Sequence, residues 1–119
     1  MPDYPKASLR IVFGPDQRVG PGKVRLLEGI ARTGSISAAA RDMEMSYRRA
    51  WLLIDELKAI FGTPVVETAT GGPGGGGAVL TPLGTSLIET YRAIEADSTA
   101  LAVKRLGNFA AAVKNQKRA

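Results

Sequence analysis

The sequence predicts an α+β fold, mainly α, with a small antiparallel sheet and a long C-terminal dimerisation helix. Three features lead to this prediction. Short helical segments with suitable capping residues lie between residues 21 and 61, two strand-like stretches surround a run of glycines at residues 65–81, and a long helix begins after Thr81. A chain of 119 residues is long enough for one domain of this kind and too short for two.

Composition places the chain among soluble globular proteins, with 45% apolar and 23% charged residues. No stretch approaches the length of a membrane helix, and the N-terminus lacks the apolar segment of a secretory signal, so we expect a cytoplasmic protein. The sequence contains no cysteine and no histidine, which removes thiolate metal ligands and the commonest catalytic base. We therefore expect no enzyme activity, no metal and no other cofactor.

The stretch "SLRIVF" at residues 8–13 alternates apolar and polar side chains, which predicts a half-buried strand. Two Gly-Pro pairs follow it. Pro21 suits the first position of a helix and Gly34 suits its C-cap, so a first helix is expected over residues 21–33. The predicted apolar face of this helix consists of Val24, Leu27, Ile30 and Ala31.

Residues 36–61 predict a helix-turn-helix. Ser35 or Ser37 can cap a short alanine-rich helix, and Ser46 can cap a third helix that ends before Gly62. The two helices are separated by very few residues, which is typical of this motif, although an ordinary αα-hairpin would have the same spacing. The predicted buried stripe of the third helix is Ala50, Ile54, Leu57 and Phe61.

Residues 65–81 predict a β-hairpin with a glycine-rich tip, which after a helix-turn-helix would be the wing of a winged helix-turn-helix domain. Its glycines match G-x-G-x-x-G, but a nucleotide-binding loop needs a helix to open directly after it, and "AVLT" follows instead. An unconstrained surface loop is the other interpretation. The residues whose backbone could approach phosphates are Thr70, Gly71, Gly72, Gly74, Gly75, Gly76 and Gly77.

The first turn of the third helix carries Tyr47, Arg48 and Arg49. The positive end of the helix dipole disfavours each arginine there by about 0.3 to 1 kcal/mol. This placement is reasonable if the turn, with its cap Ser46, faces DNA, because the N-terminal residues of a recognition helix enter the major groove. Trp51, one turn further, would either flank the DNA or belong to the core. Two solvated arginines without a partner are the alternative interpretation.

The last helix, predicted over residues 82–106, would be about 37 Å long at 1.5 Å per residue. It should project beyond a domain whose radius of gyration is about 13 Å. The four-three spacing of its apolar residues suits contact with a second copy, and packing within the same domain is the alternative. The predicted dimer interface consists of Leu87, Tyr91, Ile94 and Leu101.

Positive charge is concentrated at the C-terminus. The formal net charge is +5, and residues 104–119 carry Lys104, Arg105, Lys114, Lys117 and Arg118 with no acidic residue. The rest of the chain is formally neutral, so any basic patch there must come from the placement of charges in the fold. We expect residues 107–119 to form a mobile basic tail after the winged helix-turn-helix domain of residues 1–106.

The stretches "GSISAAARDMEMSYRRAW" and "VVETATGGPGGGGAVLTPLG" resemble the N-terminal DNA-binding domain of the ModE family of molybdate-responsive transcriptional regulators, itself similar to the winged helix-turn-helix of LysR-type regulators. The resemblance covers about residues 20–95. It implies a homodimer that binds palindromic operator DNA, with the third helix in the major groove and the long fourth helix contributing to the dimer. By position, Ser46 to Arg49 fall in the recognition turn and Gly71 to Gly77 in the wing.

Two departures from the family qualify what the resemblance implies. Family members continue into molybdate-binding domains after the long helix, whereas this sequence stops at Ala119, so no molybdate binding is expected. The family commonly has lysine where Pro73 stands, so this wing lacks a charge that would neutralise phosphate.

The sequence as a whole predicts a sequence-specific, double-stranded DNA-binding transcriptional regulator that acts as a homodimer. The alternative is a winged-helix module for protein–protein interaction, an adaptor without specific DNA binding, in which Trp51, Leu52 and Leu53 would dock a protein.

Overall fold

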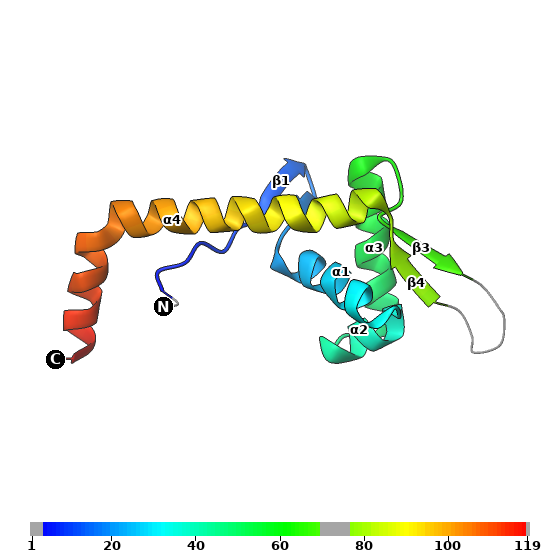
Figure 1. The fold of residues 1–119 in the computed structure, drawn as a ribbon, viewed down its shortest axis with the longest axis horizontal. Coiled ribbons are helices and arrows are strands. Elements are labelled where there is room, and N and C mark those ends of the chain that lie inside the picture. Colours follow the sequence, from blue (N-terminus) through cyan, green and yellow to red (C-terminus); the bar gives the residue numbers. More distant parts are fainter. Residues whose placement is uncertain (1–3, 70–76, 119) are drawn as a thin grey trace.

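The computed structural model describes residues 4–69 and 77–118, with side chains as far as residue 109. Figure 1 shows α1, α2 and α3 gathered near one end of α4, which extends far beyond them, and the β3–β4 hairpin projecting on the other side. The elements in chain order are β1 (Ile11–Gly14), β2 (Gln17–Val19), α1 (Pro21–Thr33), α2 (Ile36–Asp42), α3 (Tyr47–Phe61), β3 (Val66–Ala69), β4 (Gly77–Leu80) and α4 (Pro82–Arg118). The predicted fold class, mainly α with small antiparallel pairing and a long last helix, is confirmed.

Helix α1 begins at Pro21 and is closed by Gly34, which adopts the left-handed conformation with φ 70°. Its buried face differs in part from the predicted one. Leu26 joins Val24, Leu27 and Ile30 in the core, whereas Ala31 is exposed. The reason is the close approach of α2, since a Cβ placed on Gly29 would lie 3.0 Å from the Cβ of Ala39. This contact turns the buried face of α1 toward α2 and leaves Ala31 outside.

Serine side chains cap both helices of the helix-turn-helix. Ser35, rather than Ser37, caps α2, and its Oγ accepts a hydrogen bond from the backbone N–H of Ala38 at 3.0 Å. Between α2 and α3, Glu44 takes a positive φ of 56°, and the N–H of Met45 donates to the carbonyl of Ala40 at 3.0 Å. This left-handed residue closes the end of α2 and sets the direction in which α3 leaves.

The buried stripe of α3 contains Ala50, Ile54 and Leu57, as predicted. Leu53 is also buried, with 8% of its surface exposed, so it belongs to the core and is not available to a partner. Phe61 is half-buried and packs edge-to-face against Phe13 with ring centroids 5.3 Å apart.

The first strand is shorter than predicted and pairs with a second strand, β2, that was not predicted. β1 begins at Ile11 rather than at residue 8, because Ile11 pairs with Val19, the last residue of β2. Asp16, with φ 60°, makes the tight turn between the strands. A strand of three residues directly followed by Gly20-Pro21 carries too little periodicity to be recognised in the sequence.

The β3–β4 hairpin is tied to the helix-turn-helix through β4. Val66 pairs with Leu80 and Ala69 pairs with Gly77. The N–H of Ala78 donates to the carbonyl of Gly34 at 2.9 Å, which fixes β4 against the junction of α1 and α2. The predicted tip of this hairpin lies outside the described residues.

Helix α4 starts from a buried cap. The Thr81 hydroxyl donates to the carbonyl of Pro64 at 2.9 Å and accepts from the N–H of Gly84 at 3.1 Å. The helix was predicted to end at Leu106, but it continues to Arg118. A glycine inside a helix, such as Gly107, costs about 1 kcal/mol relative to alanine and does not by itself terminate the helix. None of the helices in the described residues is long and apolar enough to span a bilayer.

Tyr91 connects α4 to the N-terminal segment. Only 1% of the surface of Tyr91 is exposed, and its hydroxyl donates to the carbonyl of Leu9 at 2.6 Å. Burial raises the pKa of the Tyr91 hydroxyl above its ordinary value. Two turns further along α4, Thr99 Oγ1 accepts from the N–H of Ala7 at 2.9 Å. Residues 7–9 are therefore held along α4, and Tyr91 belongs to the core of its own domain rather than to the predicted dimer interface.

An ion-pair cluster joins α4 to α1. The Arg92 guanidinium donates Nε–H to Glu28 Oε2 at 3.0 Å and Nη2–H to Glu28 Oε1 at 2.8 Å, and a third bond reaches Glu95 Oε1 at 2.7 Å. The hydrogen bonds from Arg92 lower the pKa of Glu28 below its ordinary value, although partial burial acts in the opposite direction.

This lowered pKa predicts a pH-dependent stability. The contribution of Glu28 is complete above its ordinary pKa of 4.5 and is lost as the pH falls through the lower value in the folded state. Because the Glu28 carboxylate is about one third exposed, we expect Glu28→Gln to cost only about 1 kcal/mol at pH 7. The difference from wild type in urea unfolding should shrink below about pH 4. Glu89→Gln, which removes an exposed carboxylate from α4, is the control. An undiminished Glu28→Gln effect at low pH would contradict the ion-pair assignment.

Candidate nucleic-acid interface

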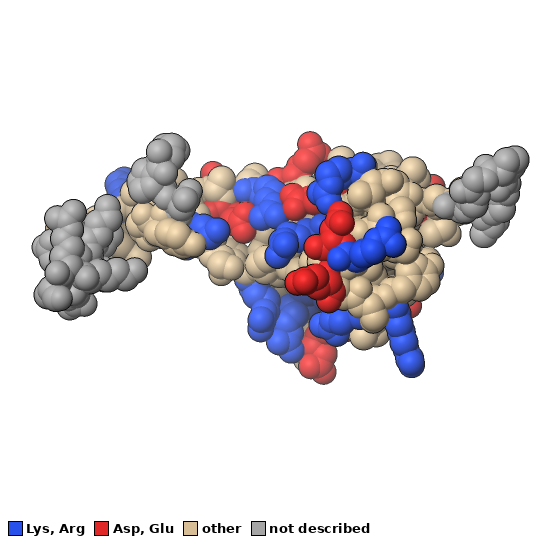
Figure 2. Space-filling view, turned by 90° about the horizontal axis from the view of Figure 1, so that it is seen from below, with Lys and Arg blue, Asp and Glu red and all other residues tan. Residues whose placement is uncertain are grey.

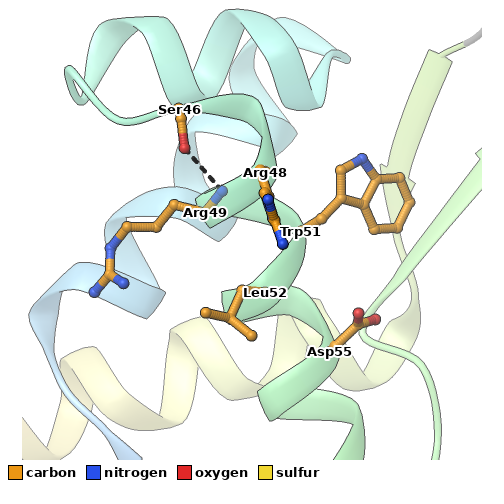
Figure 3. Close-up of a pocket in the computed structure, with 6 residues that line it drawn as sticks. All are labelled: Ser46, Arg48, Arg49, Trp51, Leu52 and Asp55. Carbon is orange, nitrogen blue, oxygen red and sulfur yellow. Dashed lines mark hydrogen bonds between the residues drawn. The ribbon is translucent and has the colours of Figure 1, made fainter.

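The N-terminal turn of α3 is presented to solvent on a capped and well-defined helix end. Ser46 Oγ accepts the backbone N–H of Arg49 at 3.0 Å, which fixes the direction of the first turn (Figure 3). Tyr47, Arg48 and Arg49 are all exposed. The structure thus brings the four predicted recognition-turn residues together at one accessible position, with the cap confirmed.

The two arginines of this turn have no carboxylate within 4.0 Å among the described residues. Elsewhere in the described chain, four other cationic side chains do form ion pairs: Arg18, Lys23, Arg32 and Arg92. The cost of placing Arg48 and Arg49 at the positive end of the α3 dipole is therefore not offset by an acidic neighbour within these residues. A polyanion would supply the missing countercharge.

Trp51 lies between the core and the surface. It is half-buried, and its ring packs edge-to-face against Tyr47 with centroids 6.2 Å apart. In Figure 3 Trp51 leaves α3 on the side of the β3–β4 strands, whereas Arg49 leaves it on the opposite side. The two aromatic rings support each other and hold Tyr47 at the helix end, where 54% of its surface is exposed.

A shallow groove on α3 contains two residues that the sequence analysis did not select for the DNA-binding site. It is lined by Ser46, Arg48, Arg49, Trp51, Leu52 and Asp55 (Figure 3). Leu52 and Asp55 follow Arg48 at the fourth and seventh positions, which places all three on one stripe of the helix. This spacing is readable in the sequence, but apolar Leu52 also suits the protein-docking surface of the adaptor interpretation. Half of its surface is exposed.

The glycine hairpin is only partly described. Gly77 begins β4 and is exposed, and this start of β4 lies beside the end of α1. The other residues predicted to contact DNA there lie outside the described residues, as does Pro73. They are Thr70, Gly71, Gly72, Gly74, Gly75 and Gly76.

Charge is mixed over the folded part of the molecule. In the face shown in Figure 2, Lys and Arg side chains alternate with Asp and Glu side chains instead of forming one continuous basic surface. An attraction for a polyanion would therefore depend on local groups such as the α3 arginines. Among the described residues, no group of three or more acidic side chains could hold a metal ion.

The exposed face of α4 retains two of the four residues predicted for a dimer. Ile94 and Leu101 are 39% and 53% exposed, whereas Leu87 is half-buried and packs against the core of its own domain. Further along the helix, Leu106 and Phe109 are 44% and 68% exposed. The helix extends beyond its own domain, and no other described residue covers this apolar row.

Comparison with known proteins places this arrangement among bacterial regulators. The family model described as "Bacterial regulatory helix-turn-helix protein, lysR family" matches residues 22–85. The molybdenum-pterin-binding protein MopB of Rhodobacter capsulatus is 53% identical over 79 residues, covering 66% of this chain and 29% of MopB. The DNA-binding transcriptional dual regulator ModE of Escherichia coli K12 is 49% identical over 71 residues, covering 60% of this chain and 27% of ModE. The chain spans less than a third of either relative.

Solved structures share the fold at low sequence identity. A LysR family transcriptional regulator superposes with a TM-score of 0.56 at 15% identity, over 77% of this chain and 30% of that one. The DNA-binding domain of CbnR, solved in a complex with DNA, gives a TM-score of 0.52 at 22% identity, over 78% of this chain and 95% of that domain.

Proposed function

Because the chain belongs to the LysR family of bacterial regulatory helix-turn-helix proteins, we propose that it binds double-stranded DNA and regulates transcription. The observation that carries this proposal is the exposed first turn of α3, where Arg48 and Arg49 have no acidic partner among the described residues. Arginines at the positive end of a helix are unfavourable in an isolated protein and favourable against phosphates or guanine edges. The resemblance to ModE supports the same assignment.

In the proposed complex α3 lies in the major groove. Arg48 would bind guanine bidentately or hold a phosphate, and Tyr47 would contact the backbone or a thymine methyl group. Leu52 and Asp55 share the stripe of Arg48 and would face base edges. The β3–β4 hairpin would lie along the backbone, where glycine N–H groups can approach phosphates because no Cβ intervenes.

The proposed active form is a homodimer formed through α4. Its exposed apolar side chains Ile94 and Leu101 are one heptad apart and belong to the four-three row that suits two packed helices. A two-fold dimer would present two α3 helices to half-sites related by the same symmetry, so the DNA target would be palindromic.

Replacing Ile94 and Leu101 together by aspartate should weaken the dimer at least about 100-fold, since two charges would be buried where two apolar side chains pack. Sedimentation equilibrium would measure the dissociation constant. Ala93→Asp with Ala100→Asp is the matched control, because it adds the same charges at the same spacing on exposed positions one residue earlier, about 100° around the helix. Equal effects of the two double variants would contradict the assigned dimer face.

Selection of bound fragments from randomised duplex DNA at physiological salt tests the proposed function itself. We expect recovery of a palindrome, which would establish sequence-specific binding and give the half-site spacing at the same time. Absence of any enriched sequence, together with a stable protein complex that is insensitive to salt, would favour the adaptor alternative, in which exposed Leu52 and half-buried Trp51 dock a protein.

A further inference from the structure

A second groove lies on the other flank of α3, between that helix, the β1–β2 hairpin and the beginning of α1. Four cationic side chains line it, together with two carboxylates: Arg10, Arg18, Lys23 and Arg49, with Asp16 and Glu56. Arg49 lines both this groove and the groove that contains Trp51, Leu52 and Asp55. The second groove is therefore continuous with the proposed recognition turn.

The pairing of the β1–β2 hairpin directs two arginines to the same side. Val12 pairs with Arg18 and Ile11 pairs with Val19, so the side chains of Val12 and Arg18 share one face of the hairpin. Arg10, two residues before Val12, falls on this face as well. Val19 is buried on the opposite face, which anchors the hairpin to the core and leaves Arg10 and Arg18 exposed.

The carboxylates of the groove neutralise only part of its positive charge. Asp16 lies 3.7 Å from Arg18 at a turn where its side chain is 97% exposed, so this pair is weak and solvated. Glu56 lies 3.4 Å from Lys23, whose ammonium also donates to the carbonyl of Arg18 at 2.7 Å. Arg10 and Arg49 have no carboxylate within 4.0 Å among the described residues. The groove thus keeps an excess of two positive charges.

We infer that the β1–β2 hairpin binds the phosphate backbone of DNA through Arg10 and Arg18. This inference rests on the proposed function. The major groove is about 12 Å wide and is bounded by a phosphate backbone on each side. Trp51 leaves α3 toward the β3–β4 hairpin (Figure 3), whereas Arg49 on the other side lines the groove bordered by the β1–β2 hairpin, so each hairpin would face one backbone. The hairpin holds register and adds affinity, whereas α3 reads the bases.

The test compares DNA binding of wild type and Arg10→Gln with Arg18→Gln, using a random-sequence duplex and any palindrome recovered by selection. Loss of two phosphate contacts should flatten the plot of log affinity against log salt by about 2 per subunit on both probes. The base preferences of the selected DNA should stay unchanged. Ethylation of phosphates on one flank of each half-site should block binding of wild type and no longer affect the variant.

Two controls distinguish the loss of contacts from the β1–β2 hairpin from a general loss of positive charge. Lys6→Gln with Lys58→Gln removes two exposed cations outside the groove and should leave the slope nearly unchanged. Arg10→Lys with Arg18→Lys keeps the charges and should restore most of the slope. Because Arg10 and Arg18 are exposed, all variants should unfold at about the wild-type temperature.

The outcomes distinguish this inference from the proposed function. If wild type binds DNA specifically and the Arg10, Arg18 variant keeps its slope, the hairpin assignment is wrong and the proposed function stands. If the variant instead changes the preferred bases, the hairpin reads sequence and the phosphate assignment is wrong. If wild type binds neither probe, the proposed function and this inference fail together.

Discussion

Replacing Arg48 and Arg49 together by alanine is expected to reduce the slope of log DNA affinity against log salt by about 2 per subunit, because two cations that would neutralise phosphate or bind guanine are removed. The same change should not destabilise the protein. Each arginine lies at the positive end of α3, so its removal should stabilise the folded state by about 0.3 to 1 kcal/mol. Fluorescence anisotropy at several salt concentrations and thermal unfolding would measure the two effects.

Opposite changes in binding and stability would identify Arg48 and Arg49 as functional residues retained at a structural cost. Lys6→Ala with Lys58→Ala removes the same charge from exposed positions outside the recognition turn and serves as the control. If the Arg48, Arg49 variant and this control had the same salt slope and the same affinity as wild type, the recognition turn would have been assigned wrongly. Repeating the measurement on a duplex with a single half-site would give the change in salt slope for one subunit alone.

Replacing Gly84 by alanine should produce the largest loss of stability among the variants discussed, with about 1 to 3 kcal/mol or more lost. Gly84 is buried in the first turn of α4, and a Cβ there would overlap the carbonyl oxygen of Val65, a backbone atom. That oxygen also accepts the N–H of Thr81, the residue that caps α4. The added methyl group would therefore push α4 away from the β3–β4 hairpin and disturb its cap.

Gly22→Ala provides the matched control for Gly84→Ala. Gly22 is exposed in the first turn of α1, and a Cβ there meets nothing within 4 Å, so the change should be neutral or stabilise by up to about 1 kcal/mol. Urea unfolding would measure both variants. A Gly84→Ala protein as stable as wild type would show that α4 does not approach Val65 as closely as the structure indicates.

Local chemistry made much of the helical region predictable. The Pro21 start and Gly34 cap of α1, and the serine cap and glycine end of α3, are properties of short sequence segments, because each satisfies backbone groups within one turn of a helix. Periodicity likewise identified the α3 stripe of Ala50, Ile54 and Leu57. The exposed arginines of the recognition turn were recognisable because they contradict the preference of a helix N-terminus for acidic residues.

Errors arose where the outcome depended on which segment packs nearby. Tyr91 fits the heptad row of α4 in the sequence, but only the fold shows that its ring enters the core and its hydroxyl meets the carbonyl of Leu9. For the same reason, Ala31 is exposed although it was predicted to be buried, and Leu53 is buried although it was assigned to a docking surface. Periodicity gives the apolar side of a helix, but the partner that covers it is set by residues distant in the chain.

Neighbours along the chain are enough to predict the helix-turn-helix, the strands on both sides of the glycine run and the charged first turn of α3. The three-dimensional fold was needed to show that β2 completes a second hairpin beside α3, and that Arg10 and Arg18 share a groove with Arg49. Strand pairing and the meeting of side chains from β1, β2 and α3 are contacts across space. No local pattern encodes them, because they exist only after the core around Val19 and Leu57 has formed.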